Sequence, residues 1–283
     1  MNMLAIIGGT GLYQLDGLEL VSEVEVDTPF GKPSAPLKKL KLGEREILFL
    51  PRHGGGHAYL PHEINYRVNI YALKQAGARM VVGFSAVGSL REEIAPGDFT
   101  IPSQYLDLTK GKREYTFFGN GIAAHVSTAM PTCPDLSKWI KGIAQENAIK
   151  LHMDKTYACV EGPRLGTKAE SFFMRGAGCD LVGMTNVPEV FLAREAQLSY
   201  STVCIATDYD CWLDDPEQHV TVQAVIERFG ASLEKAKELL MAMLQSPLPE
   251  VDEAYRKSLA MAVLTPDAAL NAEQLAMLDV LRD

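Results

Sequence analysis

The chain has 283 residues, of which 47% are hydrophobic and 22% charged, so its length permits one large globular domain or two smaller ones. Its net charge of −9, without any basic block, disfavours binding along DNA or RNA. No run approaches the roughly 18 apolar residues that a membrane span needs. The five scattered cysteines, odd in number and never in a C-x-x-C pair, predict a cytoplasmic protein without a disulfide framework or zinc site.

Short apolar runs alternate with helical patterns along the chain. Strands are predicted at residues 3–7, 46–50, 79–84, 98–102, 156–160 and 199–206. Helices are predicted at residues 62–76, 167–174, 188–196 and 221–245, the last interrupted near Gly230. This interleaving predicts one α/β domain, with a central mixed or mostly parallel sheet covered by helices.

The composition shifts toward Ala, Leu and Met after Pro247 and Pro249. We therefore expect a domain over residues 1–246 and a helical tail over residues 247–283, in which Thr265-Pro266 begins a helix. The tail looks appended rather than separately folded. It is expected to pack on the same domain or on a neighbouring subunit.

Polar groups follow three of the predicted strands within the first ninety residues. "IIGGTG" brings Thr10 after a glycine turn that allows close approach of an anion. "PRHGGGH" brings Arg52, a permanent cation, and His53, a second possible donor. "SAVGS" adds the Ser85 hydroxyl and the backbone of Ala86. Because ligands of open α/β sheets gather beyond strand ends, the three together predict an anion site.

Other readings of these motifs are weaker. The dinucleotide fingerprint fails because Gln14 stands where a glycine is needed. His53, His57 and His62 run through a glycine-rich loop rather than along a helix, so no metal site is predicted. Taken alone, Glu189 and Glu195 read as exposed helix charges, and Met184 as a core residue.

Seven motifs occur in the following order along the chain: "IIGGTG", "TPFGKPS", "RHG…H…P…NY…N", "GSLREEI.PGD", "EGPR", "MT.VPE…ARE" and "ATDYDCW". From about Ile6 to about Leu244 the sequence resembles the methylthioadenosine phosphorylases, a branch of the trimeric purine nucleoside phosphorylases. The resemblance implies a nucleoside phosphorylase-like fold, a homotrimer and no cofactor. It also implies cleavage of 5′-deoxy-5′-methylthioadenosine by inorganic phosphate, a co-substrate, to adenine and 5-methylthioribose 1-phosphate.

The resemblance also implies a role for each matching residue. Phosphate would be held by Thr10, Arg52, His53, Ser85, Ala86 and Thr185. Met184 would pack against the ribose, and Asp208 and Asp210 would face the purine with Leu165 beside the base. Apolar groups around the methylthio group would be Val222 and Val225. Leu264 in the tail would do likewise, and His125 would reach from a neighbouring subunit toward the 5′ group.

The strand-end carboxylate Asp208 fits the chemistry that this resemblance implies. As the glycosidic bond breaks, a carboxylic acid there can give its proton to purine N7, and burial would raise its pKa to keep it protonated. Its second oxygen can accept from a 6-amino group, which favours adenine over a 6-oxopurine.

Three alternatives remain open. A phosphorylase for 6-oxopurine nucleosides, including methylthioinosine, is the nearest, since Leu165 replaces a phenylalanine of animal enzymes and Asn186 replaces a threonine. A non-catalytic nucleotide-binding module would use the same anion loops. A dehydrogenase is suggested only by the first glycine turn.

Overall fold

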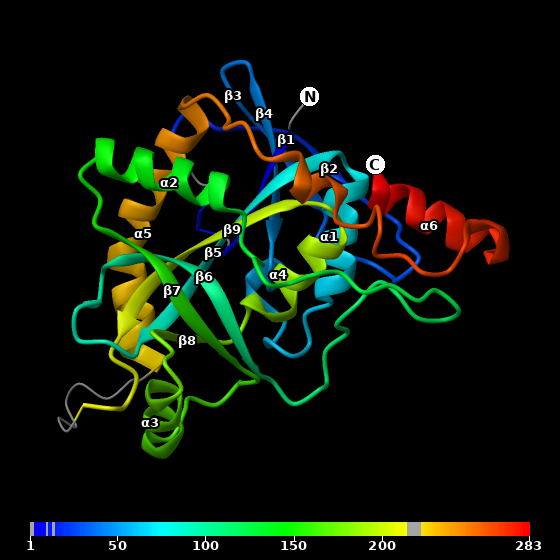
Figure 1. Cartoon of the computed structure of the whole chain (residues 1–283). Helices are drawn as coiled ribbons and strands as arrows, with labels where there is room; N and C mark the ends of the chain where they lie inside the picture. The colour runs from blue at the N-terminus through cyan, green and yellow to red at the C-terminus, as the bar shows by residue number, and fades with distance from the viewer. Residues whose placement is uncertain (1–2, 10, 13–14, 214–221) are drawn as a thin grey trace.

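The computed structural model describes residues 3–9, 11–12, 15–213 and 222–283 (Figure 1). Within these residues nine strands form one sheet in the order β2-β3-β4-β1-β5-β8-β7-β6-β9, and β9 also pairs with β5. The part from β5 to β9 therefore closes into a ring. The strands are β1 (Met3–Gly8), β2 (Glu19–Val24), β3 (Leu37–Leu42), β4 (Arg45–Pro51), β5 (Ala78–Ser89), β6 (Phe99–Leu108), β7 (Leu151–Val160), β8 (Leu181–Gly183) and β9 (Ser199–Asp208).

The sheet is mixed, as predicted. β1 runs parallel to β4 and β5, β5 runs parallel to β9, and β7 runs parallel to β6 and β8. The pairs β2–β3, β3–β4, β5–β8 and β6–β9 are antiparallel. Parallel strands bring their carboxyl ends to one edge of the sheet, where the polar motifs following β1 and β4 therefore meet.

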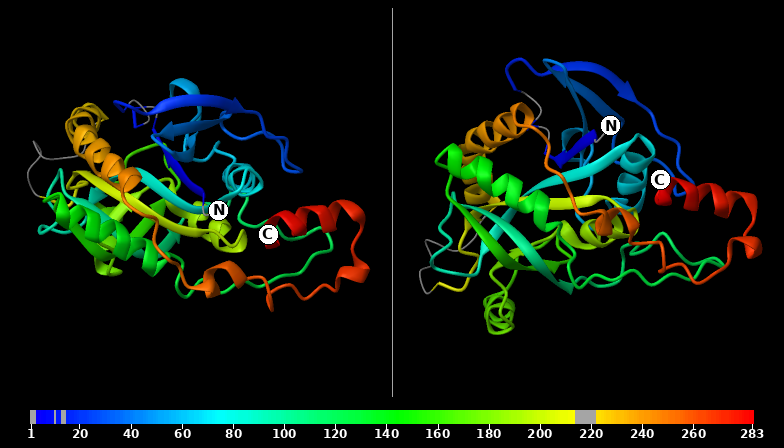
Figure 2. Two further views of the ribbon diagram at one scale, coloured as in Figure 1. Left: turned by 90° about the horizontal axis from the view of Figure 1, so that it is seen from above. Right: turned by 45° about the horizontal axis from the view of Figure 1, so that its top comes forward.

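Helices cover both faces of the sheet (Figures 1 and 2). They are α1 (Tyr66–Gln75), α2 (Pro134–Glu146), α3 (Lys168–Gly176), α4 (Asn186–Glu195), α5 (Val222–Gln245) and α6 (Ala272–Arg282). Leu4 and Ile6 of β1 join a cluster with α2 and α5, whereas Ala5 and Ile7 join a cluster with α1, α4 and α6. Because successive strand side chains point to opposite faces, this alternation shows that β1 is buried on both sides.

Local signals explain where several helices begin. Thr167 and Glu170 form a capping box that opens α3, as the sequence predicts. Asn65 caps α1 through a bond from the Val68 amide, so this helix begins at Tyr66 rather than at residue 62. The backbone of α5 is one continuous helix, so the predicted break near Gly230 is wrong.

The tail differs in detail from the sequence prediction. Thr265-Pro266 leads only into a short 3-10 turn, Asp267–Ala269, and α6 begins later behind a capping box of Asn271 and Gln274. Two further 3-10 turns are Gly55–His57 and Glu253–Lys257. Leu278 and Leu281 of α6 are buried in the same cluster as α1.

An arm projects from the body beside the C-terminus, and we define it as residues 119–125 together with 262–270 (Figures 1 and 2). Its two segments are held by an antiparallel bridge between Ala124 and Val263. The His125 amide donates to the Ala262 carbonyl at 2.9 Å, and the Leu264 amide donates to the Ala123 carbonyl at 2.8 Å. Residues far apart in the sequence thus form one unit.

Candidate active site

The register of the parallel strands brings the predicted strand-end residues to one edge. Gly8 of β1 lies opposite Pro51 of β4, and the Arg52 amide donates to the Gly8 carbonyl at 3.1 Å. Ser85 and Asp208 lie on the parallel neighbours β5 and β9, where Gly88 pairs with Asp208. Thr10, the other predicted residue of this edge, lies outside the described residues.

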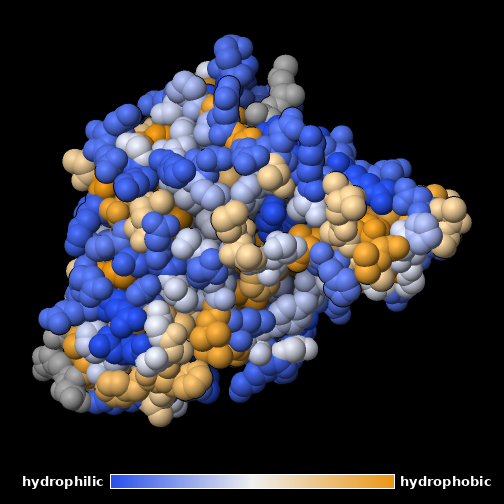
Figure 3. Space-filling view, in the orientation of Figure 1, coloured by the Kyte–Doolittle hydropathy of each residue, from blue (hydrophilic) through white to orange (hydrophobic). Residues whose placement is uncertain are grey.

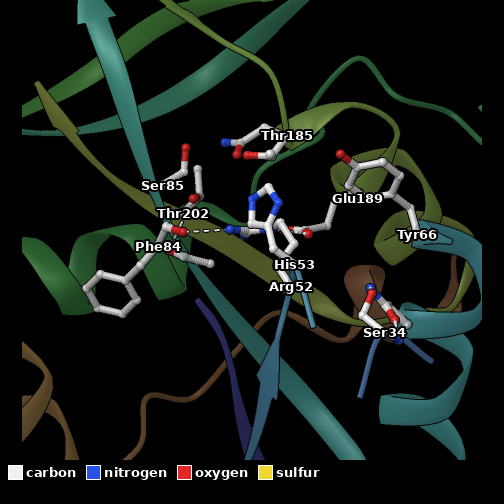
Figure 4. A network of polar contacts seen from close by, with 12 residues as sticks. Ser34, Arg52, His53, Tyr66, Phe84, Ser85, Thr185, Glu189 and Thr202 are labelled. Carbon is white, nitrogen blue, oxygen red and sulfur yellow. Dashed lines mark hydrogen bonds and ion pairs between the residues drawn. The ribbon is translucent and has the colours of Figure 1, made fainter. Parts of the chain in front are cut away.

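Arg52 is the most enclosed cation of this edge, with 2% of its surface exposed. Its Nε and Nη2 donate to the two carboxylate oxygens of Glu189 at 2.7 and 2.8 Å, and Nη1 donates to the Phe84 carbonyl at 2.7 Å (Figure 4). Although burial opposes the charge, Glu189 holds the pKa of Arg52 above its usual value. Nε and one N–H of Nη2 thus bind Glu189. The second N–H of Nη1 and the second N–H of Nη2 can donate to an anion.

Glu189 is therefore not the exposed helix charge that the sequence suggested. Only 1% of its surface is exposed, and it also accepts a hydrogen bond from the Tyr200 hydroxyl at 2.8 Å. A buried ion pair needs such additional hydrogen bonds to offset its desolvation. Glu189 fixes the orientation of Arg52 from the first turn of α4.

His53 lies next to Arg52 and stacks on His57, with ring centroids 4.0 Å apart. Burial, together with the nearby Arg52 and His57, lowers the pKa of His53 to about 4 despite the opposing hydrogen bond with Tyr59. The ring is neutral near pH 7, and its Nδ1 lies 2.9 Å from the Tyr59 carbonyl. Since a carbonyl only accepts, Nδ1 carries the proton and Nε2 presents a lone pair.

Ser85 and Thr185 are buried polar residues that Figure 4 shows on the same side of Arg52 as His53. Thr185 is the N-cap residue of α4, and in the described part of the chain its hydroxyl makes no capping bond. Val187, the second residue of α4, has non-helical backbone angles (φ −113°, ψ 128°), so the continuous helix begins after it and Thr185 offers its hydroxyl rather than a helix N-terminus. The Ser85 hydroxyl lies 3.4 Å from the carbonyl of Ala86, the next residue of β5.

Met184 precedes Thr185 and packs against a glycine turn. Gly162 has a positive φ of 69°, and a Cβ there would lie 2.5 Å from the Met184 sulfur. No other residue type would leave room for this contact without a shift. The "EGPR" motif and the "MT" motif are therefore neighbours in space.

Asp208 and Asp210 are both buried, each with 5% of its surface exposed. One Asp208 oxygen accepts from the Asp210 amide at 2.7 Å, and the other lies 2.7 Å from the Thr207 hydroxyl. That hydroxyl also lies 3.3 Å from the Val87 carbonyl. When Thr207 gives its single proton to Val87, its oxygen can accept one from a protonated Asp208.

Asp210 adopts a positive φ of 52°, which turns the chain back immediately after β9. Burial raises the pKa of its carboxyl. The loop carrying Leu165 lies close by, because a Cβ on Gly166 would lie 3.8 Å from an Asp210 oxygen and the Cys211 sulfur lies 3.7 Å from the Gly166 carbonyl. Leu165, which precedes Gly166 in this loop, is half-buried.

The remaining predicted residues are not part of this cluster. His125 and Leu264 both lie exposed on the arm, with Leu264 at 64%. In the described part of the chain, no hydrogen bond or ion pair joins either side chain to the strand-end residues. Val222 and Val225 lie at the start of α5, but their side chains fall outside the described residues.

Sequence reasoning missed several buried partners of the site, namely Glu189, Tyr200, Arg113, Glu161 and Tyr157. Arg113 forms an ion pair with Glu161 at 2.7 Å, and its side chain is fully buried. The only sequence signal is a charged residue close to a motif, at Glu161 in "EGPR" and Glu189 in "VPE". Nothing local marks Arg113, whose partners lie 46 to 74 residues away along the chain.

The described residues contain no group of three or more His, Cys, Asp or Glu side chains arranged to hold a metal ion. No helix among them combines the length and apolar character that a membrane crossing requires. All five cysteines lie within the described residues and are unpaired there.

Comparison with known proteins defines the class to which this strand-end site belongs. The model of the phosphorylase superfamily matches residues 3–245, which include β1, β9 and all of α5. The match therefore spans every strand-end residue described above. At the level of class, the chain is an enzyme of the phosphorylase superfamily.

Relatives narrow this assignment. The S-methyl-5'-thioadenosine phosphorylase of Geobacter sulfurreducens is 42% identical over 280 residues, which cover 99% of this chain and 98% of the relative. That of Saccharolobus solfataricus is 48% identical and covers 88% and 91%. A methylthioadenosine phosphorylase from an antarctic soil metagenomic library superimposes with a TM-score of 0.91 at 39% identity, over 99% of this chain and 98% of that one. The chain belongs to the methylthioadenosine phosphorylase family.

A solved relative also records a ligand. The methylthioadenosine phosphorylase of Schistosoma mansoni, in complex with adenine, has a TM-score of 0.86 and is 34% identical. The alignment covers 93% of this chain and 99% of that protein. The nucleoside phosphorylase-like fold expected from the sequence is confirmed by these structures.

Proposed function

We propose that this protein cleaves 5′-deoxy-5′-methylthioadenosine with inorganic phosphate, giving adenine and 5-methylthioribose 1-phosphate. One observation supports this most strongly: two buried carboxylates, Asp208 and Asp210, end the strand next to the one that carries Ser85. The carboxylates that would read the purine and Ser85, which would bind phosphate, thus lie on adjacent strands. The family membership gives this arrangement its chemistry.

The phosphate would bind among Thr10, Arg52, His53, Ser85, Ala86 and Thr185. The second N–H of each Arg52 terminal nitrogen and the Ser85 and Thr185 hydroxyls would donate to its oxygens. His53 presents a lone pair at Nε2 when the site is empty. A phosphate dianion beside it would raise the pKa of this ring and let Nε2 take a proton and donate.

The purine would lie against Asp208 and Asp210, with Leu165 beside the base. The bond from C1′ to the purine breaks with its electrons on the base, and a protonated Asp208 gives its proton to N7. Phosphate oxygen then bonds to C1′, whose developing positive charge the phosphate stabilises. Arg52, fixed by Glu189, contributes mainly by positioning the phosphate in line.

The sugar and its 5′ substituent would extend away from the phosphate. Met184 would pack against the ribose, and Val222 and Val225 would line an apolar pocket for the methylthio group. His125 and Leu264 would enter from a neighbouring subunit, because the arm that carries them projects from the body. This requires an oligomer, which we propose to be a homotrimer.

The same chemistry bears on the cofactor, the cellular compartment and the partners of the protein. Inorganic phosphate supplies the nucleophile and Asp208 the proton, so we propose a reaction without a cofactor. Five unpaired cysteines fit a reducing compartment, which we propose to be the cytoplasm. The partners would be the nucleoside, phosphate and other copies of the chain, with neither a nucleic acid nor a membrane.

The proposal is tested by measuring free base released from methylthioadenosine, adenosine, inosine and methylthioinosine, each with and without phosphate. We expect adenine release that depends on phosphate and is fastest from methylthioadenosine. Release without phosphate dependence would overturn the reaction. Fastest cleavage of a 6-oxopurine substrate would contradict the proposed selection of a 6-amino group by Asp208.

A further inference from the structure

The peptide bond between Met184 and Thr185 is held on both of its polar sides by buried side chains. Its carbonyl, on Met184, accepts from Arg113 Nη1 at 2.8 Å. Its N–H, on Thr185, donates to the Tyr157 hydroxyl at 3.4 Å. In a trans peptide these two groups point in opposite directions, so the two contacts together resist rotation of the plane.

Arg113 is committed entirely to backbone and carboxylate acceptors around this peptide. Nη1 also donates to the Val187 carbonyl at 2.6 Å, and Nε and Nη2 donate to the Glu161 side chain and carbonyl at 2.7 and 3.0 Å. Nη2 lies 3.5 Å from the Val160 carbonyl as well. All five N–H groups thus have acceptors, and those acceptors belong to the turns after β7 and after β8.

Tyr157 reaches the same peptide from β7 by crossing the last residue of β8. A Cβ on Gly183 would lie 1.9 Å from the Tyr157 hydroxyl, so only a glycine leaves this path open. Burial raises the pKa of Tyr157, and a hydrogen-bonding interaction with Ser85 opposes that rise. The hydroxyl therefore lies buried at the Thr185 amide.

We propose that Arg113 and Tyr157 act as a pair of positioning residues that fix the Met184–Thr185 peptide and thereby hold the sugar and phosphate subsites in register. The proposal rests on the roles given above to Met184 and Thr185. Met184 and Thr185 flank this single peptide, so a rotation of its plane displaces both side chains. Neither Arg113 nor Tyr157 needs to touch a substrate for this effect.

The first test is Tyr157→Phe, which removes only the hydroxyl, with Tyr255→Phe as the matched control. Tyr255 is also a buried phenol, and its hydroxyl donates to the Met130 and Thr132 carbonyls, away from the strand-end site. We expect Tyr157→Phe to raise the KM values for phosphate and for methylthioadenosine, lowering kcat/KM about tenfold, the effect of one lost buried hydrogen bond. The control should lower the melting temperature to a similar extent with both KM values unchanged.

The second test combines Tyr157→Phe with Arg113→Lys, which keeps the charge but loses the fork. If the two residues hold one peptide, the double variant should lose less activity than the product of the single losses, because either change already frees the plane. A loss in the double variant equal to the product of the two single losses would show that the residues act independently and would overturn the paired action. Unchanged KM values in Tyr157→Phe would overturn the proposal even if Arg113→Lys fails to fold, whereas an inactive wild type would overturn the proposed function instead.

Discussion

At the scale of single residues, the site depends on charges whose partners are distant in sequence. The strand-end positions of Arg52 and Asp208 could be predicted, because a polar residue directly after a buried apolar run is a local signal. The same signal was wrong for Ser85, which lies inside β5 because this strand continues to Ser89. The pairing of Arg52 with Glu189 could not, since 137 residues separate them and a single glutamate on a helix is usually solvated. Burial turned that glutamate into the group that orients the cation.

The ion pair predicts a specific response to Glu189→Gln. The change leaves Arg52 charged and buried without its counter-ion, which should lower the free energy of unfolding by about 3–5 kcal/mol. Added phosphate should then raise the melting temperature more in the variant than in the wild type, because the anion replaces the missing negative charge. Thermal melts with and without phosphate measure both effects.

The matched control is Glu170→Gln, which breaks the ion pair with Arg164 at 2.6 Å on the exposed surface. An exposed pair contributes little, so this variant should melt close to the wild type. A Glu189→Gln protein as stable as this control, with an unchanged response to phosphate, would contradict the role given to the buried pair.

At the scale of elements, long apolar strands were predictable and short or exposed ones were not. β8 has only three residues, and nearly every residue of β2 is exposed, so neither strand shows a periodic pattern of apolar residues. α2 was likewise missed, although Asp135 and a proline at its first turn mark its start. Because β8 leads directly into Met184 and Thr185, missing it also hid the path by which Tyr157 reaches that peptide.

Glu195, at the end of α4, makes the packing of this helix against residues 116–117 dependent on pH. It accepts hydrogen bonds from the Thr116 hydroxyl and the Phe117 amide, which precede the arm. Burial raises the pKa of its carboxyl to about 7. Because folding raises this pKa, the protonated carboxyl stabilises the folded protein. This stabilisation is complete below the pKa of the unfolded chain, about 4.3, and is lost as the pH rises through the folded-state pKa of about 7.

Glu195→Gln should therefore remove part of the pH dependence of stability. The amide cannot ionise, so the variant should lose less unfolding free energy than the wild type between pH 5 and pH 8, by on the order of 3 kcal/mol. Urea unfolding at the two pH values measures this. Parallel pH profiles for the two proteins would show that Glu195 does not ionise in this range.

At the scale of the whole molecule, the arm separates two predicted residues from the others. His125 and Leu264 lie far apart in the sequence, yet the bridge between Ala124 and Val263 holds them on one projection. Apolar surface gathers over the arm and over α3 (Figure 3), where Phe172 and Phe173 are exposed. Patches of this kind mark contacts between proteins, which fits an arm that enters a neighbouring subunit.

Mixed oligomers test this use of the arm. A His125→Ala subunit keeps its own strand-end site, and an Asp208→Asn subunit keeps its arm. If the arm serves a neighbour, the two variants produced together should cleave methylthioadenosine faster than the sum of the two produced separately. Activity equal to that sum would place His125 outside the neighbouring site.

The central claim is that Asp208 protonates the purine and selects the 6-amino group, and one variant tests it most directly. Phosphate-dependent kcat/KM should be measured for methylthioadenosine and methylthioinosine in the wild type and in Asp208→Asn. The account predicts a loss of at least about a hundredfold on methylthioadenosine, the usual contribution of a general acid, with a smaller loss on methylthioinosine. Near-normal turnover of methylthioadenosine by Asp208→Asn would contradict it.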